Sequence, residues 1–439
     1  MSQSTQPNLA NKKLNLRAQI VKTLLIVQQG QSLASVLGHQ IDQVNERDRA
    51  LFHEILMGTL RQWYALKSIA LPLLTKPLNN ETVESCVYVG LYQLLCTRVP
   101  AHAVISETVD ATKQLGYEAL AGVVNAILRN VSRGTEQYQA QLKAAHGLPS
   151  WLYKRLKRDW PGKLEQLCEN LKQIAPLTLR VNTRKISREA YLNKLKAQEI
   201  ACQPCVISDV GIILEQAVQI TALPGFEQGW FSVQDEHAQL CASLVPDLND
   251  QVVLDACAAP GGKTAHLLEK YNVKKMIALD QDPKRLLRVS ENLERLDLTE
   301  KSPVEIIAAD ATTWQSKDAL DCIVLDAPCS AIGVMRRHPD IRLLRLSTDI
   351  AQTVALQKQI LDHLWQELKV GGTLLYITCS ILKAENESQM QEFFQTHSNA
   401  KEIKIEADWG IEQTHGRQLL PQTAQGDGFY YCKIQKIAD

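Results

Sequence analysis

The 439-residue sequence predicts a multidomain protein: an all-helical amino-terminal domain, a small α+β middle domain and a carboxyl-terminal α/β domain of Rossmann-like type. Apolar residues recur at three- and four-residue spacing from Leu14 to about Arg133, which indicates helices. Two strand patterns follow near residues 177–184 and 225–233. From about Gln234, strand patterns alternate with helical ones, as in a doubly wound sheet. We expect the three domains over residues 1–140, 147–233 and 234–439.

The helical region contains clear amphipathic patterns. Residues 48–61 place Leu51, Ile55 and Leu56 on one face, which predicts a helix packed on its neighbours. Residues 122–129 predict a later packing helix. Residues 134–147 are polar and poorly periodic, so we interpret them as the linker to the middle domain.

Composition places the chain among ordinary globular proteins, with 45% hydrophobic and 22% charged residues. The longest early apolar run, residues 24–27, is too short for a signal peptide or a membrane span, so we expect a cytoplasmic protein. Eleven cysteines without framework spacing indicate reduced thiols. Cys202 and Cys205 have metal-type spacing, but the sequence lacks a second such pair, so we expect a structural role for both and no metal.

Charge is unevenly distributed although its sum is zero. Residues 1–160 carry 18 Lys and Arg against 11 Asp and Glu, which gives +7 and leaves −7 for the remainder. This asymmetry favours a polyanionic partner for the amino-terminal part, with a merely solvated basic helical domain as the alternative. Residues 151–160 interleave basic and aromatic side chains, as phosphate contacts and base stacking require. An amphipathic helix with a basic solvent face fits that stretch equally well.

Five buried strands are predicted in the carboxyl-terminal domain, and residues 428–436 are expected to add an edge strand. The first strand turns through Gly261-Gly262 into a helix, a loop that lets backbone approach a ligand closely. Asp280, about 20 residues further on, is placed to bind ribose hydroxyls, and Asp310 could hold a base edge. We therefore expect a nucleoside-bearing cofactor. The predicted strands are residues 252–256, 275–280, 304–308, 322–326 and 373–378.

Two alternative ligand classes fit the glycine loop less well. A nucleotide-binding Walker A loop would need glycine at the position of Cys257, and the loop lacks the G-x-G-x-x-G spacing of a dehydrogenase. A triphosphatase is therefore a weak alternative, and a dehydrogenase is disfavoured.

Cysteines end two of the predicted strands. Residues 371–380 read GGTLLYITCS and residues 321–330 read DCIVLDAPCS, so Cys379 and Cys329 lie where ligands bind in open α/β sheets. A single free cysteine is more often a small buried hydrophobe. The repetition of the pattern favours a catalytic role, and we interpret Cys379 as a nucleophile.

These motifs carry a family resemblance. DACAAPGGKT, LDQD, DAPCSAIGVMRRHPDIR and YITCSI resemble the motifs of S-adenosylmethionine-dependent RNA cytosine-5 methyltransferases. RDRALFHEILMGTLR and VPAHAVISETVDATK resemble the NusB-like helical RNA-binding domain of the bacterial RsmB/Sun (Fmu) branch, which modifies 16S ribosomal RNA. The resemblance implies Cys379 as nucleophile and Cys329 as an aid to product release. It also implies an S-adenosyl-L-methionine pocket lined by Cys257, Ala258, Ala259, Pro260, Gly261, Gly262, Lys263, Asp280, Asp310 and Asp326.

The implied chemistry explains why cysteines are needed. Carbon 5 of cytosine is a weak nucleophile, so a thiolate adds at carbon 6 and makes an enamine whose carbon 5 can take the methyl group. Asp326 could stabilise the charge that develops on the base, which must be unstacked to be reached. We expect a monomer that acts on 16S ribosomal RNA without a membrane partner. The alternatives are a transfer RNA cytosine-5 methyltransferase and a non-enzymatic RNA-binding assembly factor.

Overall fold

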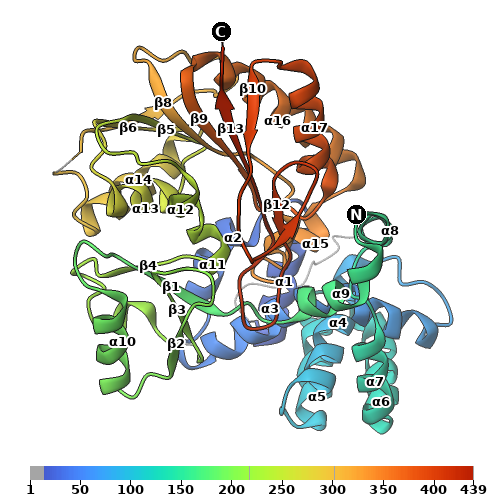
Figure 1. Ribbon diagram of the computed structural model, residues 1–439. Coiled ribbons are helices and arrows are strands. Elements are labelled where there is room, and N and C mark those ends of the chain that lie inside the picture. Colours follow the sequence, from blue (N-terminus) through green and yellow to red (C-terminus); the bar gives the residue numbers. More distant parts are fainter. Residues whose placement is uncertain (1–13, 217, 301, 439) are drawn as a thin grey trace, which may run out of the picture. The chain divides into compact units, whose positions relative to one another are not determined.

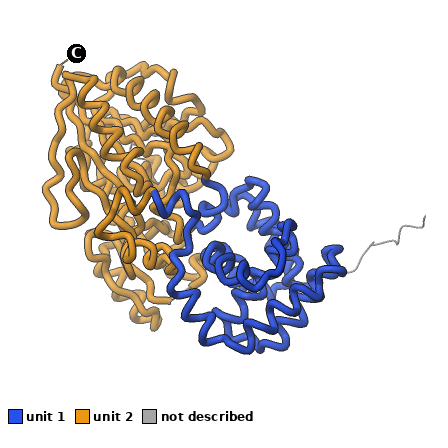
Figure 2. The backbone as a smooth tube through the Cα atoms, turned by 90° about the vertical axis from the view of Figure 1, so that its right-hand side faces the viewer, with its two compact units in different colours: residues 1–154, 338–345 blue, residues 155–337, 346–439 orange. Residues whose placement is uncertain are grey.

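The computed structural model describes residues 14–216, 218–300 and 302–438, which form two compact units (Figure 2). Unit 1 contains the chain up to residue 154 together with residues 338–345. Unit 2 contains residues 155–337 and 346–439. Residues 1–13 of the predicted first domain lie outside the described residues. Among the helices of the described ranges, none is long and apolar enough to span a bilayer.

Unit 1 is all-helical, as predicted, and its core surrounds α4 (Glu81–Cys96) (Figure 1). Apolar residues face every side of α4, which is the pattern of a helix buried on all sides. Gly58 of α3 permits close approach to α4, because a side chain there would overlap the Tyr92 ring. The other α-helices that lie wholly within residues 14–154 are α1 (Leu16–Gln28), α2 (Leu33–Asp42), α3 (Arg49–Ala70), α5 (Ala101–Gln114), α6 (Ala121–Arg133) and α7 (Thr135–Ala144).

The predicted linker is a helix. Residues 134–147 contain α7, whose Leu142 is buried in the helical core. The stretch looked irregular because α7 buries little else and exposes polar side chains over most of its surface.

A short segment from the carboxyl-terminal half of the sequence also belongs to unit 1. Residues 338–345 contain α15 (Ile341–Leu344), and Leu343 and Leu344 pack against the helical core. The Asp340 carboxylate accepts a hydrogen bond from the Leu33 amide at the start of α2, at 2.8 Å. Arg342 is buried, and burial together with the nearby Arg61 lowers its pKa to about 9. This packing was not predicted.

The first part of unit 2 is a small antiparallel sheet with strand order β2-β3-β1-β4, which confirms the predicted α+β architecture. Helix α10 (Arg188–Ala197) packs Tyr191 and Leu195 into its core, after Ser187 caps the helix by accepting from the Ala190 amide. Helices α8 (Ser150–Asp159) and α9 (Leu164–Lys172) precede the sheet. The strands are β1 (Leu177–Val181), β2 (Cys202–Pro204), β3 (Gly211–Leu214) and β4 (Phe231–Val233).

The second part of unit 2 is a nine-stranded mixed sheet with the path β11-β12-β13-β9-β8-β5-β6-β7, from which β10 branches by pairing with β13. Strands β5 to β9 are parallel, and β13 is antiparallel to β9. The strands are β5 (Val252–Ala256), β6 (Lys275–Asp280), β7 (Val304–Ala308), β8 (Leu320–Asp326), β9 (Leu368–Thr378), β10 (Ala400–Ile403), β11 (Ile411–Glu412), β12 (Arg417–Leu419) and β13 (Phe429–Lys436).

Helices cover both faces of this sheet (Figure 1). Helices α13 (Gly262–Lys270) and α14 (Pro283–Arg295) pack on one face, and α16 (Ser347–Glu367) and α17 (Glu387–Thr396) pack on the other. The parallel strands are therefore buried on both sides, which explains their continuous apolar runs. The short helices α11 (Glu236–Gln239) and α12 (Cys241–Leu244) precede β5.

Two details of the large sheet differ from the sequence expectation. Strand β9 does not begin after Gly371-Gly372 but continues back to Leu368, because a register shift against β8 accommodates the glycine pair. Strand β13 is not at the edge, since β9 pairs with one side of it and β10 and β12 pair with the other. Both features depend on partners that are distant in the sequence.

The strand order places a switch point at β5. Strand β6 pairs with one side of β5 and β8 pairs with the other, so the chain runs outward through β6 and β7 and then returns to the opposite side of β5 as β8. Ligands bind beyond the carboxyl ends of the strands at such a point. The fold thus predicts a site formed by the loops after β5, β6, β8 and β9.

Candidate active site

The loop after β5 makes a tight turn into α13. Cys257 and Gly261 both have left-handed backbone, with φ of 62° and 94°. A Cβ on Gly261 would lie 3.1 Å from the Val289 Cα, so glycine fits both the conformation and the close packing on α14. The seven consecutive residues predicted to bind the cofactor, from Cys257 to Lys263, therefore wrap the end of β5 and begin α13.

Asp280 ends β6 beside this loop and is 4% exposed. Its carboxylate accepts the Ala259 amide at 3.1 Å and the Asp282 amide at 3.0 Å, which fixes its orientation. The Arg285 guanidinium nitrogen Nη1 lies 3.8 Å from Asp280 Oδ2. A carboxylate offers about four acceptor positions, so these two amides leave capacity for hydroxyl donors. These residues fit the ribose of a nucleoside at the switch point of the sheet.

Asp310 lies two residues after β7 and is exposed. Its carboxylate accepts the Thr312 amide at 2.8 Å and the Thr312 hydroxyl at 2.7 Å. These hydrogen bonds lower the pKa of Asp310. The structure thus places Asp310 at the same sheet edge as Asp280, although it is partly engaged in its own turn.

Asp326 and Lys263 form an ion pair across the site, with 2.5 Å between Nζ and Oδ2. Asp326 ends β8 and Lys263 lies in the first turn of α13. Burial disfavours the Lys263 charge, but the Asp326 carboxylate outweighs that effect and raises the pKa of Lys263. A charged ammonium and a partly exposed carboxylate therefore lie together between the β5 loop and the strand-end cysteines.

The motif strand β5 also carries a buried acid that sequence reasoning did not assign. Asp255 is fully buried and accepts the Thr264 hydroxyl at 2.5 Å. Burial raises the pKa of Asp255 to about 7. The position of Asp255 inside the DACAAPGGKT motif was the sequence signal that could have identified it. Its hydrogen bond with Thr264 of α13 indicates that Asp255 supports the loop between β5 and α13.

The two strand-end cysteines meet in space. The Sγ atoms of Cys329 and Cys379 are 3.4 Å apart, and both side chains are partly exposed. Parallel pairing of β8 with β9 brings them together, because Asp326 lies opposite Ile377 in the register. The hydrogen bond to Cys379, followed by burial, raises the pKa of Cys329 well above its usual value, so Cys329 holds its proton as a thiol.

The loop after Cys329 is anchored to the loop after β9. The Gly333 amide donates to the Cys379 carbonyl at 3.0 Å. A Cβ on Gly333 would lie 2.7 Å from the same oxygen, so this contact requires glycine. The Ala327 amide donates to the Ile377 carbonyl at 2.9 Å. These main-chain contacts join the two loops on both sides of Cys329.

The basic and aromatic stretch 151–160 forms most of α8, and Trp160, directly after the helix, differs in burial from its basic residues. Trp160 is 5% exposed and donates from its indole nitrogen to the Ile381 carbonyl at 2.7 Å. It therefore supports the loop after Cys379, and it is too buried to stack on a base. Lys157 and Arg158 are exposed, as an amphipathic helix with a basic face requires.

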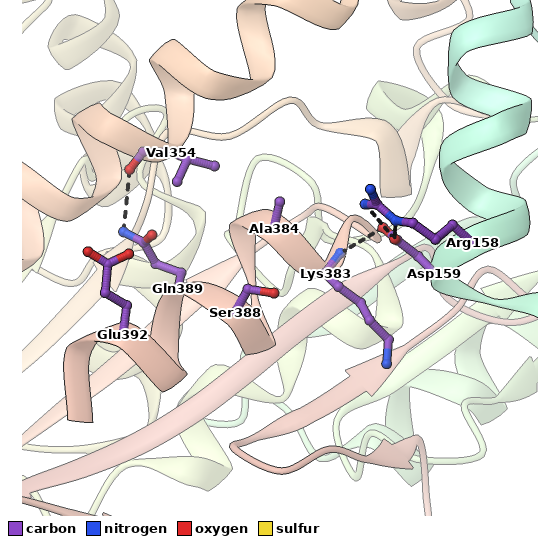
Figure 3. Close-up of a pocket in the computed structure, with 8 residues that line it drawn as sticks. All are labelled: Arg158, Asp159, Val354, Lys383, Ala384, Ser388, Gln389 and Glu392. Atoms are coloured by element: carbon purple, nitrogen blue, oxygen red, sulfur yellow. Dashed lines mark hydrogen bonds and ion pairs between the residues drawn. The ribbon is translucent and has the colours of Figure 1, made fainter. Parts of the chain in front are cut away.

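Beside α8 lies a cavity of about 490 Å³ (Figure 3). The Lys383 amide donates to Asp159, whose carboxylate also accepts two hydrogen bonds from Arg158. The lining of the cavity mixes two cationic and two acidic side chains, so the cavity does not select ligands of one sign of charge. It is lined by Arg158, Asp159, Val354, Lys383, Ala384, Ser388, Gln389 and Glu392.

All eleven cysteines are free thiols. Cys205 is buried and Cys202 is partly buried on the small sheet, which agrees with the structural role expected for them. Within residues 14–216, 218–300 and 302–438, no group of three or more His, Cys, Asp or Glu side chains could hold a metal ion.

Comparison with known proteins identifies the family to which the chain belongs. Residues 242–435 match the family described as 16S rRNA methyltransferase RsmB/F, residues 148–221 match the ferredoxin-like domain of RsmF/B-like methyltransferases, and residues 14–133 match the NusB family. The chain is 44% identical to ribosomal RNA small subunit methyltransferase B of Pseudomonas putida, over 97% of this chain and 99% of that protein. The chain belongs to the RsmB/F methyltransferase family.

Other similarities agree with this membership. The Vibrio cholerae protein of the same name is 41% identical over 96% of this chain and 98% of its own length. The crystal structure of PH0851 has a TM-score of 0.78, with 20% identity over 96% of this chain and 99% of that one, which supports the fold. The predicted resemblance, the fold class and the class of rRNA methyltransferase are thereby confirmed.

Proposed function

We propose that this RsmB/F family member transfers a methyl group from S-adenosyl-L-methionine to carbon 5 of a cytidine in 16S ribosomal RNA, through a covalent bond to Cys379. The observation that carries the proposal is the 3.4 Å contact between the Cys329 and Cys379 thiols at the carboxyl ends of adjacent parallel strands. Two thiols at a ligand-binding sheet edge suit a reaction in which one attacks the base and the other acts on the adduct.

The cofactor supplies an electrophilic methyl group, and the residues around the switch point suit its nucleoside part. Gly261 makes the left-handed turn before α13, and Gly262, which begins α13, is partly exposed. Asp280 has acceptor capacity for the ribose hydroxyls, and Asp310 lies at the neighbouring strand end for the base edge. Cys257 to Lys263, Asp280, Asp310 and Asp326 are therefore proposed to line this pocket, as the family resemblance implies.

The target base is proposed to lie between the ion pair and the thiols. Cys379 adds to carbon 6, which places negative charge on the ring and gives carbon 5 the nucleophilicity that methylation needs. Asp326, 31% exposed and charged beside Lys263, can accept a hydrogen bond from the base while Lys263 offsets the developing negative charge. After the methyl group has moved to carbon 5 and the demethylated cofactor has left as a thioether, a base would take the carbon 5 proton. The electron pair of that bond would re-form the double bond between carbons 5 and 6 and expel the Cys379 thiolate, with Cys329 assisting release of the methylated base.

The RNA partner is proposed to bind largely through the basic amino-terminal part. Residues 1–160 carry a net +7, a total that includes the exposed basic side chains of α8. Binding that depends on phosphate contacts weakens as salt rises. We propose a monomer in the cytoplasm with 16S ribosomal RNA as partner. Transfer RNA as substrate stays an alternative, and a non-enzymatic assembly role is disfavoured by the retained thiol pair.

Bisulfite sequencing of total RNA tests the proposal. Cells that lack this protein should lose one cytosine-5 methylation in 16S ribosomal RNA, and expression of the intact chain should restore it. The chain with Cys379→Ala is the matched control and should fail to restore it. Loss of a transfer RNA site with an unchanged 16S pattern would instead establish the alternative substrate.

A further inference from the structure

A buried glutamate connects the two loops that carry Cys329 and Cys379. Glu385 ends the short 3-10 helix η7 (Lys383–Glu385) after β9 and is 0% exposed. Each cysteine is followed by a serine, and both Ser330 and Ser380 are also buried. This arrangement was not predicted, because the sequence separates Glu385 from Ser330 by 55 positions.

The Glu385 carboxyl group binds both serines. Oε1 accepts the Ser330 amide at 2.6 Å, and Oε2 accepts the Ser330 hydroxyl at 2.6 Å. The same Oε2 accepts the Ser380 hydroxyl, and the two serine hydroxyls are 3.2 Å apart. One side chain therefore fixes the residue after Cys329 and the residue after Cys379 at the same time.

Neighbouring side chains hold Glu385 itself in place. The Tyr376 hydroxyl donates to the Glu385 carbonyl at 2.9 Å. Asn386 accepts the Thr378 hydroxyl at 2.5 Å and donates to the Ser380 carbonyl at 3.0 Å. Because a buried polar group is costly to leave unsatisfied, this network favours a single arrangement of the two loops.

We propose that Glu385 is a positioning residue that keeps Cys329 against Cys379 by bridging Ser330 and Ser380. The inference rests on the proposed function, since it assumes that Cys379 forms the covalent adduct and that Cys329 acts on it afterwards. Without the bridge, Cys379 still attacks the base, because β9 and the Gly333 contact hold it. Cys329 then loses its position, and the adduct is released slowly.

The test compares covalent enzyme–RNA conjugates on denaturing gels, with S-adenosylmethionine and an unmodified 16S ribosomal RNA transcript as the probes. Glu385→Ala, with both cysteines present, should accumulate roughly tenfold more conjugate than wild type, the factor expected for losing a buried hydrogen-bond network. Glu385→Gln should accumulate much less, since its amide oxygen can accept the Ser330 amide and its NH₂ can donate to the two serine hydroxyls.

A matched control separates positioning from general destabilisation. Glu236 is likewise 0% exposed and accepts a main-chain amide, from Ile207 at 2.6 Å, but it belongs to α11. Glu236→Ala should therefore destabilise unit 2 without accumulating conjugate. If Glu385→Ala does not fold, Ser330→Ala carries the same test with a smaller expected accumulation, because it removes the hydroxyl contact with Oε2 and keeps the amide contact with Oε1.

Combination with the cysteine variant gives the decisive outcome. Cys329→Ala should accumulate conjugate, and adding Glu385→Ala should not increase it, since both changes act through Cys329. Accumulation with Cys329→Ala but not with folded Glu385→Ala or Ser330→Ala overturns the role of Glu385 alone. Absence of conjugate from Cys329→Ala, with methylation intact, overturns the proposed two-cysteine function and the Glu385 role with it.

Discussion

The two sheets of unit 2 use their cysteines and polar residues differently. The large sheet is parallel around β5, so the strand ends that carry Asp280, Asp326, Cys329 and Cys379 all meet at one edge. The small sheet is antiparallel, so successive strand ends alternate between its two edges. A parallel sheet can therefore gather reactive groups from distant segments, whereas an antiparallel sheet of this size disperses them.

The two sheets also differ in the residues that fill their interiors. The small sheet encloses an apolar core in which Tyr191 stacks on Phe231 at 5.5 Å between ring centroids. Its cysteine pair, Cys202 and Cys205, is close in sequence. Burial raises the pKa of Cys205, which makes it an inert thiol. The two thiols that lie 3.4 Å apart are instead separated by 50 positions and follow adjacent parallel strands.

The largest expected effect separates the two thiols of the large sheet. Cys379→Ala should abolish methylation, a loss on the order of 10⁴-fold or more as for other removed nucleophiles, and should form no RNA conjugate. Cys329→Ala should still attack and should accumulate a conjugate that survives denaturation. Single-turnover methylation assays and denaturing gels measure both.

A reversed result would change the assignment. Conjugate from Cys379→Ala and none from Cys329→Ala would make Cys329 the nucleophile. Conjugate from neither, with both variants folded and active, would exclude a covalent mechanism and leave the contact between the thiols without a catalytic meaning.

The second effect concerns the core of the small sheet. Phe231→Ala should lower the free energy of unfolding by about 3–5 kcal/mol, because it removes a fully buried ring and leaves a cavity. Urea denaturation followed by tryptophan fluorescence measures the change. The fraction of folded enzyme that is covalently bound to RNA should match that of wild type. A change in that fraction would show that the small sheet takes part in the chemistry.

A smaller effect tests the cofactor edge of the large sheet. Asp280→Ala should weaken S-adenosylmethionine binding by about 1.5–3 kcal/mol, the value of a hydrogen bond to a charged acceptor. Calorimetry on the intact chain measures it, because deleting the helical part would strip the cover from Leu343 and Leu344. An unchanged affinity would contradict the ribose assignment. Asp310→Ala is the companion variant, and its exposure and local turn predict a smaller loss.

The smallest effect returns to the small sheet. Cys202→Ser should change the free energy of unfolding by no more than about 0.5 kcal/mol and leave methylation unchanged, since Cys202 is partly exposed on the strand β2 at the end of the sheet. Denaturation curves and a methylation assay measure both. A large loss of activity would show that the pair with metal-type spacing has a function that the geometry does not reveal.

The sequence by itself determined the local features of this protein. It defined β5, β6 and β7 to the residue and placed Asp280, Asp326, Cys329 and Cys379 at or just beyond strand ends. It also predicted the helical region around α3 and the turn at Gly261. These features depend on residues a few positions apart, because apolar periodicity and glycine conformation act over one turn or one strand.

Only the tertiary structure decided what those elements meet. The contact between Cys329 and Cys379 depends on the register of β8 with β9. The Glu385 bridge depends on the same register, because that register brings Ser330 and Ser380 together. The burial of Trp160 and the packing of α15 in unit 1 likewise depend on segments far away in sequence. No local pattern encodes such pairings, because their energy comes from burying the groups of two distant segments against each other.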